Sequence, residues 1–153
     1  MRSLELKIPP LVLMAVFALL MWGVSTITPV LHFIMAGALA LGAAIAAIGG
    51  LLAALGVAEF RKARTTVDPR MPHKSEALVI SGVYRISRNP MYVGFLVALA
   101  GWALCLSNVA AFLFLPLFVI YMNRYQIEPE ERYMRARFGS DFDCYVGQVR
   151  RWL

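Results

Sequence analysis

The chain has 153 residues, of which 60% are hydrophobic and 16% are charged. With a mean hydropathy of +0.68, it is too apolar for a small soluble domain, and we expect one membrane domain spanning residues 1–153. The net charge of +6 does not indicate nucleic-acid binding, because the basic residues lie only in segments that flank apolar runs. Neither Cys105 nor Cys144 has a metal-ligand companion at short spacing, so we expect no metal site.

The first two apolar runs are long enough to cross a bilayer. The first covers about residues 8–27 and exceeds the apolar region of an ordinary signal peptide. The second follows Pro29 and covers about residues 31–58. Its small residues recur at helical spacing, including Gly42 and Gly49, and such residues let helices approach closely in lipid.

A polar, basic segment at residues 59–89 then leads into a third apolar helix. Asn89 is a preferred N-cap residue, and Pro90 suits the first helical position because its missing N–H would have no intrahelical partner. The start of a helix is electropositive, and Arg88 adds a full charge there. This junction is therefore a candidate site for a carboxylate or phosphate.

The third and fourth helices are predicted over residues 90–106 and 109–125, as a short hairpin. Each covers roughly 25 Å, less than the roughly 30 Å of a hydrocarbon core. We expect the hairpin to be buried against the other helices or to thin the bilayer locally. Gly94, Ala98 and Gly101 form a stripe of small residues, which we expect to seat the fourth helix closely.

The remaining segment, residues 126–153, is polar and amphipathic. It predicts a helix that ends at Gly139, followed by a second short helix with Trp152 as an interfacial anchor. Pro116 is expected to kink the helix before this segment.

The distribution of positive charge predicts the topology. All 15 Lys and Arg residues lie in the N-terminal lead, in segment 59–89, or from Arg124 onward. The positive-inside rule then places both termini and the long loop in the cytoplasm, which requires an even number of spans. The predicted fold is all-α, with four transmembrane helices, the last two forming a short hairpin, and cytoplasmic amphipathic helices.

Antiparallel packing of the hairpin brings two charged regions together. Tyr92 and Arg124 should lie at the same depth, with Glu130 and Glu131 one or two turns beyond. A cationic wall that includes Arg88 would then face a pair of carboxylates. Such an arrangement suits a zwitterionic ligand.

Two spaced motifs carry a resemblance to known membrane enzymes. They are Gly82-x-Tyr84-x-x-x-Arg88-Asn89-Pro90-x-Tyr92-x-Gly94 and Glu130-Glu131-x-x-Met134 with Phe138-Gly139-x-x-Phe142-x-x-Tyr145. Over roughly residues 60–152 the chain resembles the isoprenylcysteine carboxyl methyltransferase and phospholipid methyltransferase superfamily. Asn89 replaces the usual His of the isoprenylcysteine enzymes, which is similar to phosphatidylethanolamine N-methyltransferases and many bacterial relatives. Phe142 replaces an aromatic residue that is often Tyr.

The resemblance implies methyl transfer from S-adenosylmethionine to a small lipophilic or membrane-embedded acceptor, such as a lipid amine, an isoprenoid carboxylate or a thiol. The implied cofactor site comprises Tyr84, Arg88, Asn89, Pro90, Tyr92, Gly94, Glu130 and Glu131.

We assign expected roles within this implied site. Arg88 or the helix N-terminus would hold the methionyl carboxylate, and Glu130 or Glu131 would hold the ammonium group or the ribose hydroxyls. Tyr92 would pack near the sulfonium as a catalytic candidate. Arg124, the second catalytic candidate, would orient an anionic acceptor that enters from the lipid.

Other interpretations of these residues stay open. Arg88 and Arg124 also suit ordinary membrane anchors, and Arg124 is spaced for an i,i+4 pair with Glu128. An NADPH-dependent reductase of the sterol type and a non-catalytic scaffold are the alternative functions. His73 is a further catalytic candidate, and residues 65–73 are a candidate lid over the cofactor.

Overall fold

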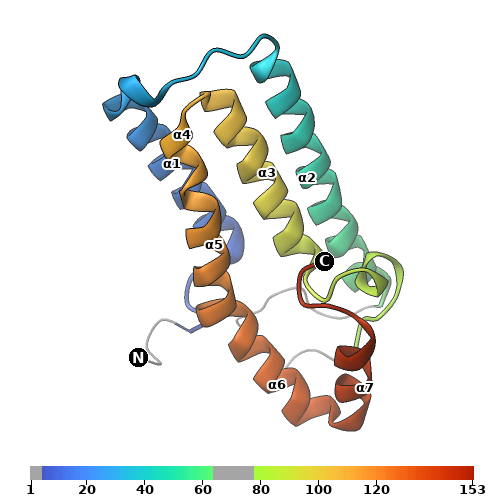
Figure 1. Cartoon of the computed structure of the whole chain (residues 1–153). Coiled ribbons are helices and arrows are strands. Elements are labelled where there is room, and N and C mark those ends of the chain that lie inside the picture. The colour runs from blue at the N-terminus through green and yellow to red at the C-terminus, as the bar shows by residue number, and fades with distance from the viewer. Residues whose placement is uncertain (1–4, 64–77) are drawn as a thin grey trace.

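Helix α3 lies at the centre of a bundle of helices. The computed structural model describes residues 5–63 and 78–153. Helix α2 packs along one side of α3, and α1 and α5 pack along another (Figure 1). Every regular element of the described residues is a helix, so the all-helical prediction is confirmed. The long elements of the bundle are α1 (Pro10–Ile27), α2 (Ala38–Lys62), α3 (Pro90–Leu106) and α5 (Phe114–Met122).

Three of the described helices are long and apolar enough to cross a membrane. They are α1, α2 and the helical run from Val109 to Phe138, whereas α3 is apolar but has only 17 residues. Large apolar side chains such as Leu39 and Ile48 are exposed on the outside of the bundle. Such a surface suits lipid and not water, and the chain is an integral membrane protein.

Helix α2 begins later and ends later than predicted. Pro29–Leu31 forms a short 3₁₀ turn, and the chain becomes α-helical only after Gly37. Gly37 has a φ of +77°, a left-handed conformation that glycine adopts without a steric penalty and that separates the turn from the helix. At the other end, α2 continues through Lys62, where the basic residues of its last turn complement the helix dipole.

The stripe of small residues on α3 packs against α2. A Cβ atom on Gly94 would lie 2.6 Å from the carbonyl oxygen of Gly49, and one on Gly101 would lie 2.5 Å from the amide nitrogen of Ala46. Our expectation that this stripe seats the fourth helix was therefore wrong. Helix α2 also presents small residues, so the two backbones can come into direct contact, which maximises van der Waals packing.

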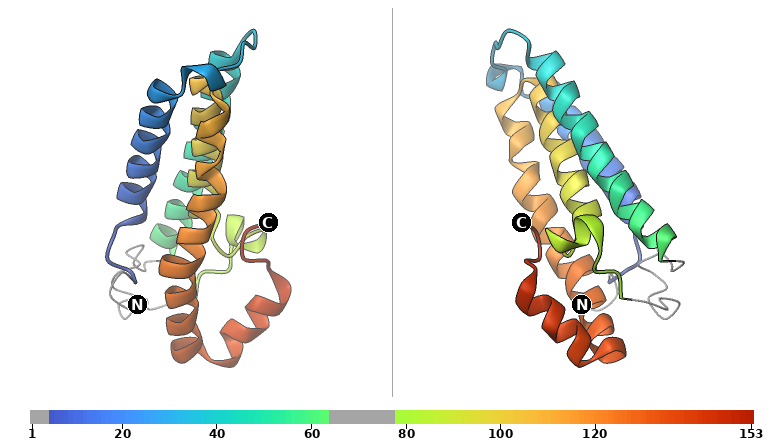
Figure 2. Two further views of the ribbon diagram at one scale, coloured as in Figure 1. Left: turned by 60° about the vertical axis from the view of Figure 1, so that its left-hand side comes forward. Right: turned by 90° about the vertical axis from the view of Figure 1, so that its right-hand side faces the viewer.

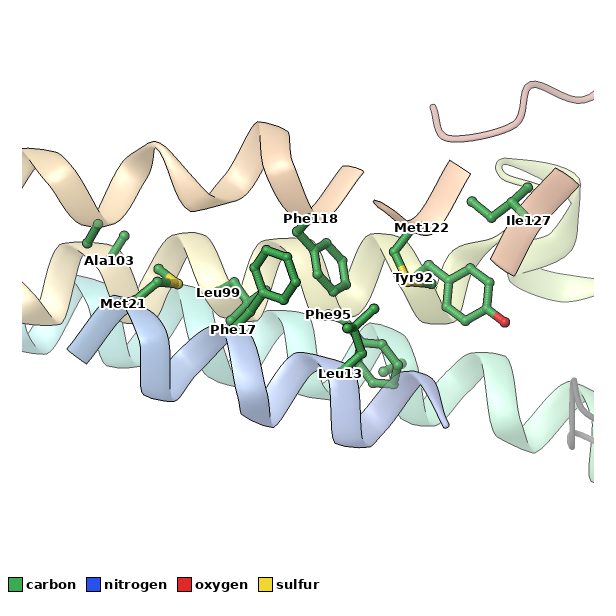
Figure 3. Close-up of a cluster of buried hydrophobic side chains, with 12 residues drawn as sticks. Leu13, Phe17, Met21, Tyr92, Phe95, Leu99, Ala103, Phe118, Met122 and Ile127 are labelled. Carbon is green, nitrogen blue, oxygen red and sulfur yellow. The ribbon is translucent and has the colours of Figure 1, made fainter. Parts of the chain in front are cut away.

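The opposite side of α3 contributes to a core of bulky side chains. Phe17 of α1 and Phe118 of α5 pack edge to face, with 5.3 Å between their ring centroids. Leu99 of α3 and Met122 of α5 are buried in the same cluster. Figure 3 shows these side chains in a row, with Tyr92 near one end and its hydroxyl pointing away from the row.

The fourth apolar helix does not stop at residue 125. A single-residue break at Leu113, three residues before Pro116, separates α4 (Val109–Phe112) from α5. The helix then passes through the π-helical turn η5 (Asn123–Ile127) and continues as α6 (Glu128–Phe138) (Figure 2).

Proline at the start of α6 is accommodated without ending the helix. Pro129 has no N–H for the carbonyl of Tyr125, four residues earlier. That carbonyl instead accepts a hydrogen bond of 3.1 Å from the amide of Leu6. The N-terminal lead therefore replaces the missing donor, and the helix is longer than the sequence pattern predicts.

The chain reverses after α6 and returns to the start of α3 (Figure 1). Gly139 ends the helix with a φ of +52°, as predicted, and α7 (Ser140–Gln148) is the predicted second short helix. Phe142 and Tyr145 of α7 are buried in a second, smaller apolar cluster. This cluster packs α7 against α6 and against Leu78.

Candidate functional site

The junction before α3 is held by its own side chains and by the end of the chain. Asn89 occupies the N-cap position, as predicted, but its side chain makes no capping bond. Its Nδ2 instead donates to the carbonyl oxygen of Arg151 at 2.9 Å. The Oγ of Ser87 accepts from the Asn89 amide at 3.0 Å. Asn89 therefore connects the start of α3 to the C-terminal residues.

Tyr92, Gln126 and Glu130 form a hydrogen-bonded group between α3 and the long fourth helix. The Tyr92 hydroxyl donates to Glu130 Oε1 at 2.7 Å, and Gln126 Nε2 donates to the same oxygen at 2.5 Å. Tyr92 and Gln126 are buried. Two donors therefore fix one oxygen of the Glu130 carboxylate, and Tyr92 contacts Glu130 directly, whereas the prediction placed Glu130 one or two turns beyond Tyr92.

Glu131 has different partners from Glu130. Its Oε1 accepts from Arg88 at 2.8 Å, and its two oxygens accept from Arg151 at 3.1 and 2.6 Å. The side chain of Glu131 is only 16% exposed. Its charge is thus compensated by two guanidinium groups within the protein.

Arg88 is the cation at the centre of the site. Besides its bond to Glu131, its NH1 donates to the carbonyl oxygen of Val149 at 2.6 Å and, at 3.4 Å, to that of Val146. Its Nε is buried and has no hydrogen-bond partner among the described residues. A buried donor without an acceptor costs free energy.

Tyr84 is buried next to the site and contacts α2 and α7. It lies in the short 3₁₀ turn η4 (Gly82–Arg85), packs edge to face on Phe60, and accepts a 2.6 Å bond from the Tyr145 hydroxyl at its carbonyl oxygen. Burial raises the pKa of Tyr145 to about 12 and raises that of Tyr84 as well. Both phenols stay neutral at physiological pH, and the pair joins η4 to α7.

Three other predicted site residues lie outside this hydrogen-bonded network. Pro90 is buried as the first residue of α3, and Gly94 faces the backbone of α2. Arg124 is 55% exposed and forms the i,i+4 pair with Glu128, with 3.1 Å between NH1 and Oε2. The structure does not bring Arg124 to Tyr92, although both lie near the same end of the hairpin.

Two members of the network were missed from the sequence. Gln126 precedes Glu130 by four residues, and residues at this spacing are neighbours on one face of a helix. The contact between them could therefore have been predicted. Arg151 had no comparable signal, because its contact with Glu131 depends on the reversal at Gly139. The catalytic candidate His73 and the candidate lid at 65–73 lie outside the described residues.

Comparison with known proteins shows the family to which the chain belongs. A family model for phospholipid methyltransferase matches residues 37–141, which is more than half of the chain. The chain belongs to the phospholipid methyltransferase family. The match includes the start of α3 and both glutamates, but it ends before Arg151.

Two named enzymes are among the proteins to which the chain is similar. The chain is 31% identical over 77 residues to a protein-S-isoprenylcysteine O-methyltransferase of Schizosaccharomyces pombe, covering 50% of this chain and 33% of that protein. It is 28% identical over 112 residues to a probable protein-S-isoprenylcysteine O-methyltransferase of Oryza sativa subsp. indica, covering 73% and 59%. A Haemophilus influenzae protein is 40% identical over its whole length of 63 residues, which is 41% of this chain.

The match to the two named enzymes is partial. The chain spans a third of the yeast enzyme and 59% of the length of the rice enzyme. No solved structure matches the chain.

Proposed function

We propose that the protein is a membrane methyltransferase that uses S-adenosylmethionine and acts on a lipophilic acceptor. Membership of the phospholipid methyltransferase family and similarity to isoprenylcysteine O-methyltransferases support this function. These comparisons favour neither the sterol-type reductase nor the scaffold.

The residues of the site fit the proposed cofactor. S-adenosylmethionine carries a carboxylate and an ammonium group at its methionyl end, and it would supply the methyl group. The observation that carries the proposal is Arg88, whose buried Nε has no acceptor while its other nitrogens are bonded. A carboxylate would satisfy this donor, assisted by the positive end of α3.

Glu130 is the better candidate for a cationic group of the cofactor. Both of its hydrogen bonds with the described residues end on Oε1, and Glu130 is half-buried. Glu131 is instead bonded to two arginines. Tyr92 would keep Glu130 oriented, and the buried network would exclude water from the cofactor's methionyl end.

The acceptor would enter from the lipid and be positioned for direct displacement at the methyl group. Phospholipid and protein-S-isoprenylcysteine are the substrates named for the family and for the Schizosaccharomyces pombe relative. The exposed guanidinium of Arg124, at the end of the apolar part of its helix, would orient an anionic acceptor. We place this end of the bundle on the cytoplasmic side, because the basic residues gather there.

The test is methyl transfer by the purified full-length chain in detergent or proteoliposomes. Radiolabelled S-adenosylmethionine is mixed with a total lipid extract, with phosphatidylethanolamine, or with a farnesylated cysteine analogue. We expect a labelled, organic-soluble product with one of these acceptors and binding of the donor in its absence. Thermal stabilisation by NADPH without binding of S-adenosylmethionine would overturn the proposal, as would binding of neither molecule.

A further inference from the structure

The last residues of the chain form one side of the candidate site. We call residues 149–153 the C-terminal segment. Its carbonyl oxygens accept four hydrogen bonds from the residues just before α3, which belong to a distant part of the sequence. The bonds run from Arg88 NH1 to Val149 at 2.6 Å, from the Arg88 amide to Arg150 at 2.9 Å, and from Asn89 Nδ2 and Ser87 Oγ to Arg151 at 2.9 and 3.4 Å.

The side chain of Arg151 adds a charged connection to the same region. Its Nε and NH2 bind the two oxygens of Glu131 at 3.1 and 2.6 Å, in the forked geometry that a guanidinium and a carboxylate favour. Arg88 binds Glu131 from another direction, with 2.8 Å between NH2 and Oε1. Glu131 is therefore a bridge between two arginines, one before α3 and one in the C-terminal segment.

These contacts determine how the Arg88 guanidinium is oriented. The group is planar and rigid, so fixing both terminal nitrogens also fixes the direction of its Nε–H. NH2 is held by Glu131 and NH1 by the carbonyl oxygen of Val149, and Nε is the nitrogen left without a partner among the described residues. Both holding groups depend on the C-terminal segment.

We propose that Arg151 is a positioning residue, which acts through Glu131 to hold Arg88 in the orientation that binds the carboxylate of the methyl donor. This inference rests on the proposed function and adds a role for a residue beyond the family match, which ends at residue 141. Arg151 itself need not touch the donor. Its contribution is the ordering of Arg88 before the donor arrives.

Trp152 anchors the segment independently of Arg151. Its Nε1 donates to Asn123 Oδ1 in the π-helical turn at 3.0 Å, and its ring packs against the main apolar core. Removal of the Arg151 charge should therefore leave the C-terminal segment near its place. The effect expected is a less ordered Arg88, and not the loss of the segment.

The experiment compares two neighbouring arginines in the full-length, detergent-solubilised chain. Arg151→Gln removes the forked pair with Glu131. Arg150→Gln also removes one positive charge, but from an exposed side chain one residue earlier. It leaves in place the Arg150 carbonyl oxygen that accepts from the Arg88 amide. Binding of tritiated S-adenosylmethionine is measured by equilibrium dialysis, which yields both the Kd and the number of sites.

We expect Arg151→Gln to raise the Kd about tenfold at an unchanged number of sites, with Arg150→Gln within about twofold of the unsubstituted chain. Glu131→Gln should have a similar effect, and the double variant should be no weaker than the weaker single variant, because both changes remove the same connection. Arg151→Lys keeps the charge without the fork and should be intermediate.

Equal Kd values for Arg151→Gln and Arg150→Gln would overturn the inference. So would fewer sites at an unchanged Kd, which is the result expected if Arg151 only stabilises the fold. If Arg151→Gln does not fold, the Kd of Arg151→Lys decides in the same way, an unchanged value being contrary to the inference. If the unsubstituted chain does not bind the donor, the proposed function itself fails, and this inference fails with it.

Discussion

At the scale of single residues, the adjacent carboxylates of α6 differ in their partners. Glu130 accepts from Tyr92 and Gln126, whereas Glu131 is bonded to Arg88 and Arg151. The sequence motif presents them as an equivalent acidic pair. Their separate networks arise because consecutive residues of a helix point about 100° apart, one toward α3 and the other toward the end of the chain.

This difference predicts that Glu130→Gln weakens binding of S-adenosylmethionine about tenfold or more, because it removes the negative charge that would face the cationic end of the donor. The matched control is Glu128→Gln in the same helix. Among the described residues Glu128 pairs with the exposed Arg124, and exposed ion pairs contribute about 0–1 kcal/mol. Calorimetric titration of both variants checks this, and equal losses of affinity would contradict it.

At the scale of elements, the close packing of α2 on α3 fixes the start of α3. The backbones meet at small residues, and Gly56 near the end of α2 lies against Met91 in the first turn of α3. Arg88 lies just before this turn and Tyr92 lies within it, so we expect a shift of α2 to move both side chains. Packing of apolar helices is thus coupled to the polar site.

Two consecutive glycines of α2 test this coupling. A Cβ on Gly49 would meet the backbone of Ala98 and Gly94, whereas a Cβ on Gly50 would have no atom within 4 Å. We expect Gly49→Ala to cost about 1–3 kcal/mol of stability by overpacking and to weaken donor binding. Gly50→Ala should be neutral or stabilising, because Ala is the better helix former.

Thermal unfolding in detergent, followed by circular dichroism, measures the first effect. Donor binding at a temperature where both variants are folded measures the second. If Gly49→Ala and Gly50→Ala unfold at the same temperature, the direct backbone contact between the two helices is not important for stability.

At the scale of the whole molecule, the polar residues of the site lie at one end of the bundle. The N-terminal lead contacts the long fourth helix at this end. The Leu6 amide is bonded to Tyr125 of η5, and Glu5 forms an ion pair of 2.7 Å with Arg132 of α6. The opposite end carries the turn after α1, where His32 is hydrogen-bonded to Ser25 at 3.0 Å. In a bilayer these two ends would face opposite aqueous phases.

Labelling of single cysteines tests this arrangement. With Cys105 replaced by Ser, the native Cys144 is exposed near the C-terminus, and Ile34→Cys with Cys144→Ser marks the opposite turn. In sealed vesicles of one orientation, a membrane-impermeant maleimide should label only one of the two variants. Reversing the vesicles should exchange them, and labelling of both from the same side would contradict the arrangement.

Some of these features could be predicted from the sequence and others could not. The predicted bounds of α3 agree with the structure, because local signals mark both ends. Asn89-Pro90 marks the start of the helix, and Ser107-Asn108 marks its end. Helix length and antiparallel direction alone predicted that Tyr92 and Glu130 lie near the same end of the hairpin, but not that they are directly hydrogen-bonded. The partner of the Gly94 stripe was predicted wrongly, since α3 is apolar around its whole circumference and its sequence does not mark which face meets which helix.

The sequence by itself determined that the chain is helical and embedded in a membrane, where α3 begins, and which charged residues gather at one end. These features depend on apolar run length, local capping signals and charge distribution. Only the tertiary structure decided that α2 packs on the small residues of α3, that Glu130 and Glu131 join different networks, and that Arg151 returns to Arg88. Those outcomes depend on contacts between residues that are distant in sequence, for which local patterns carry no signal.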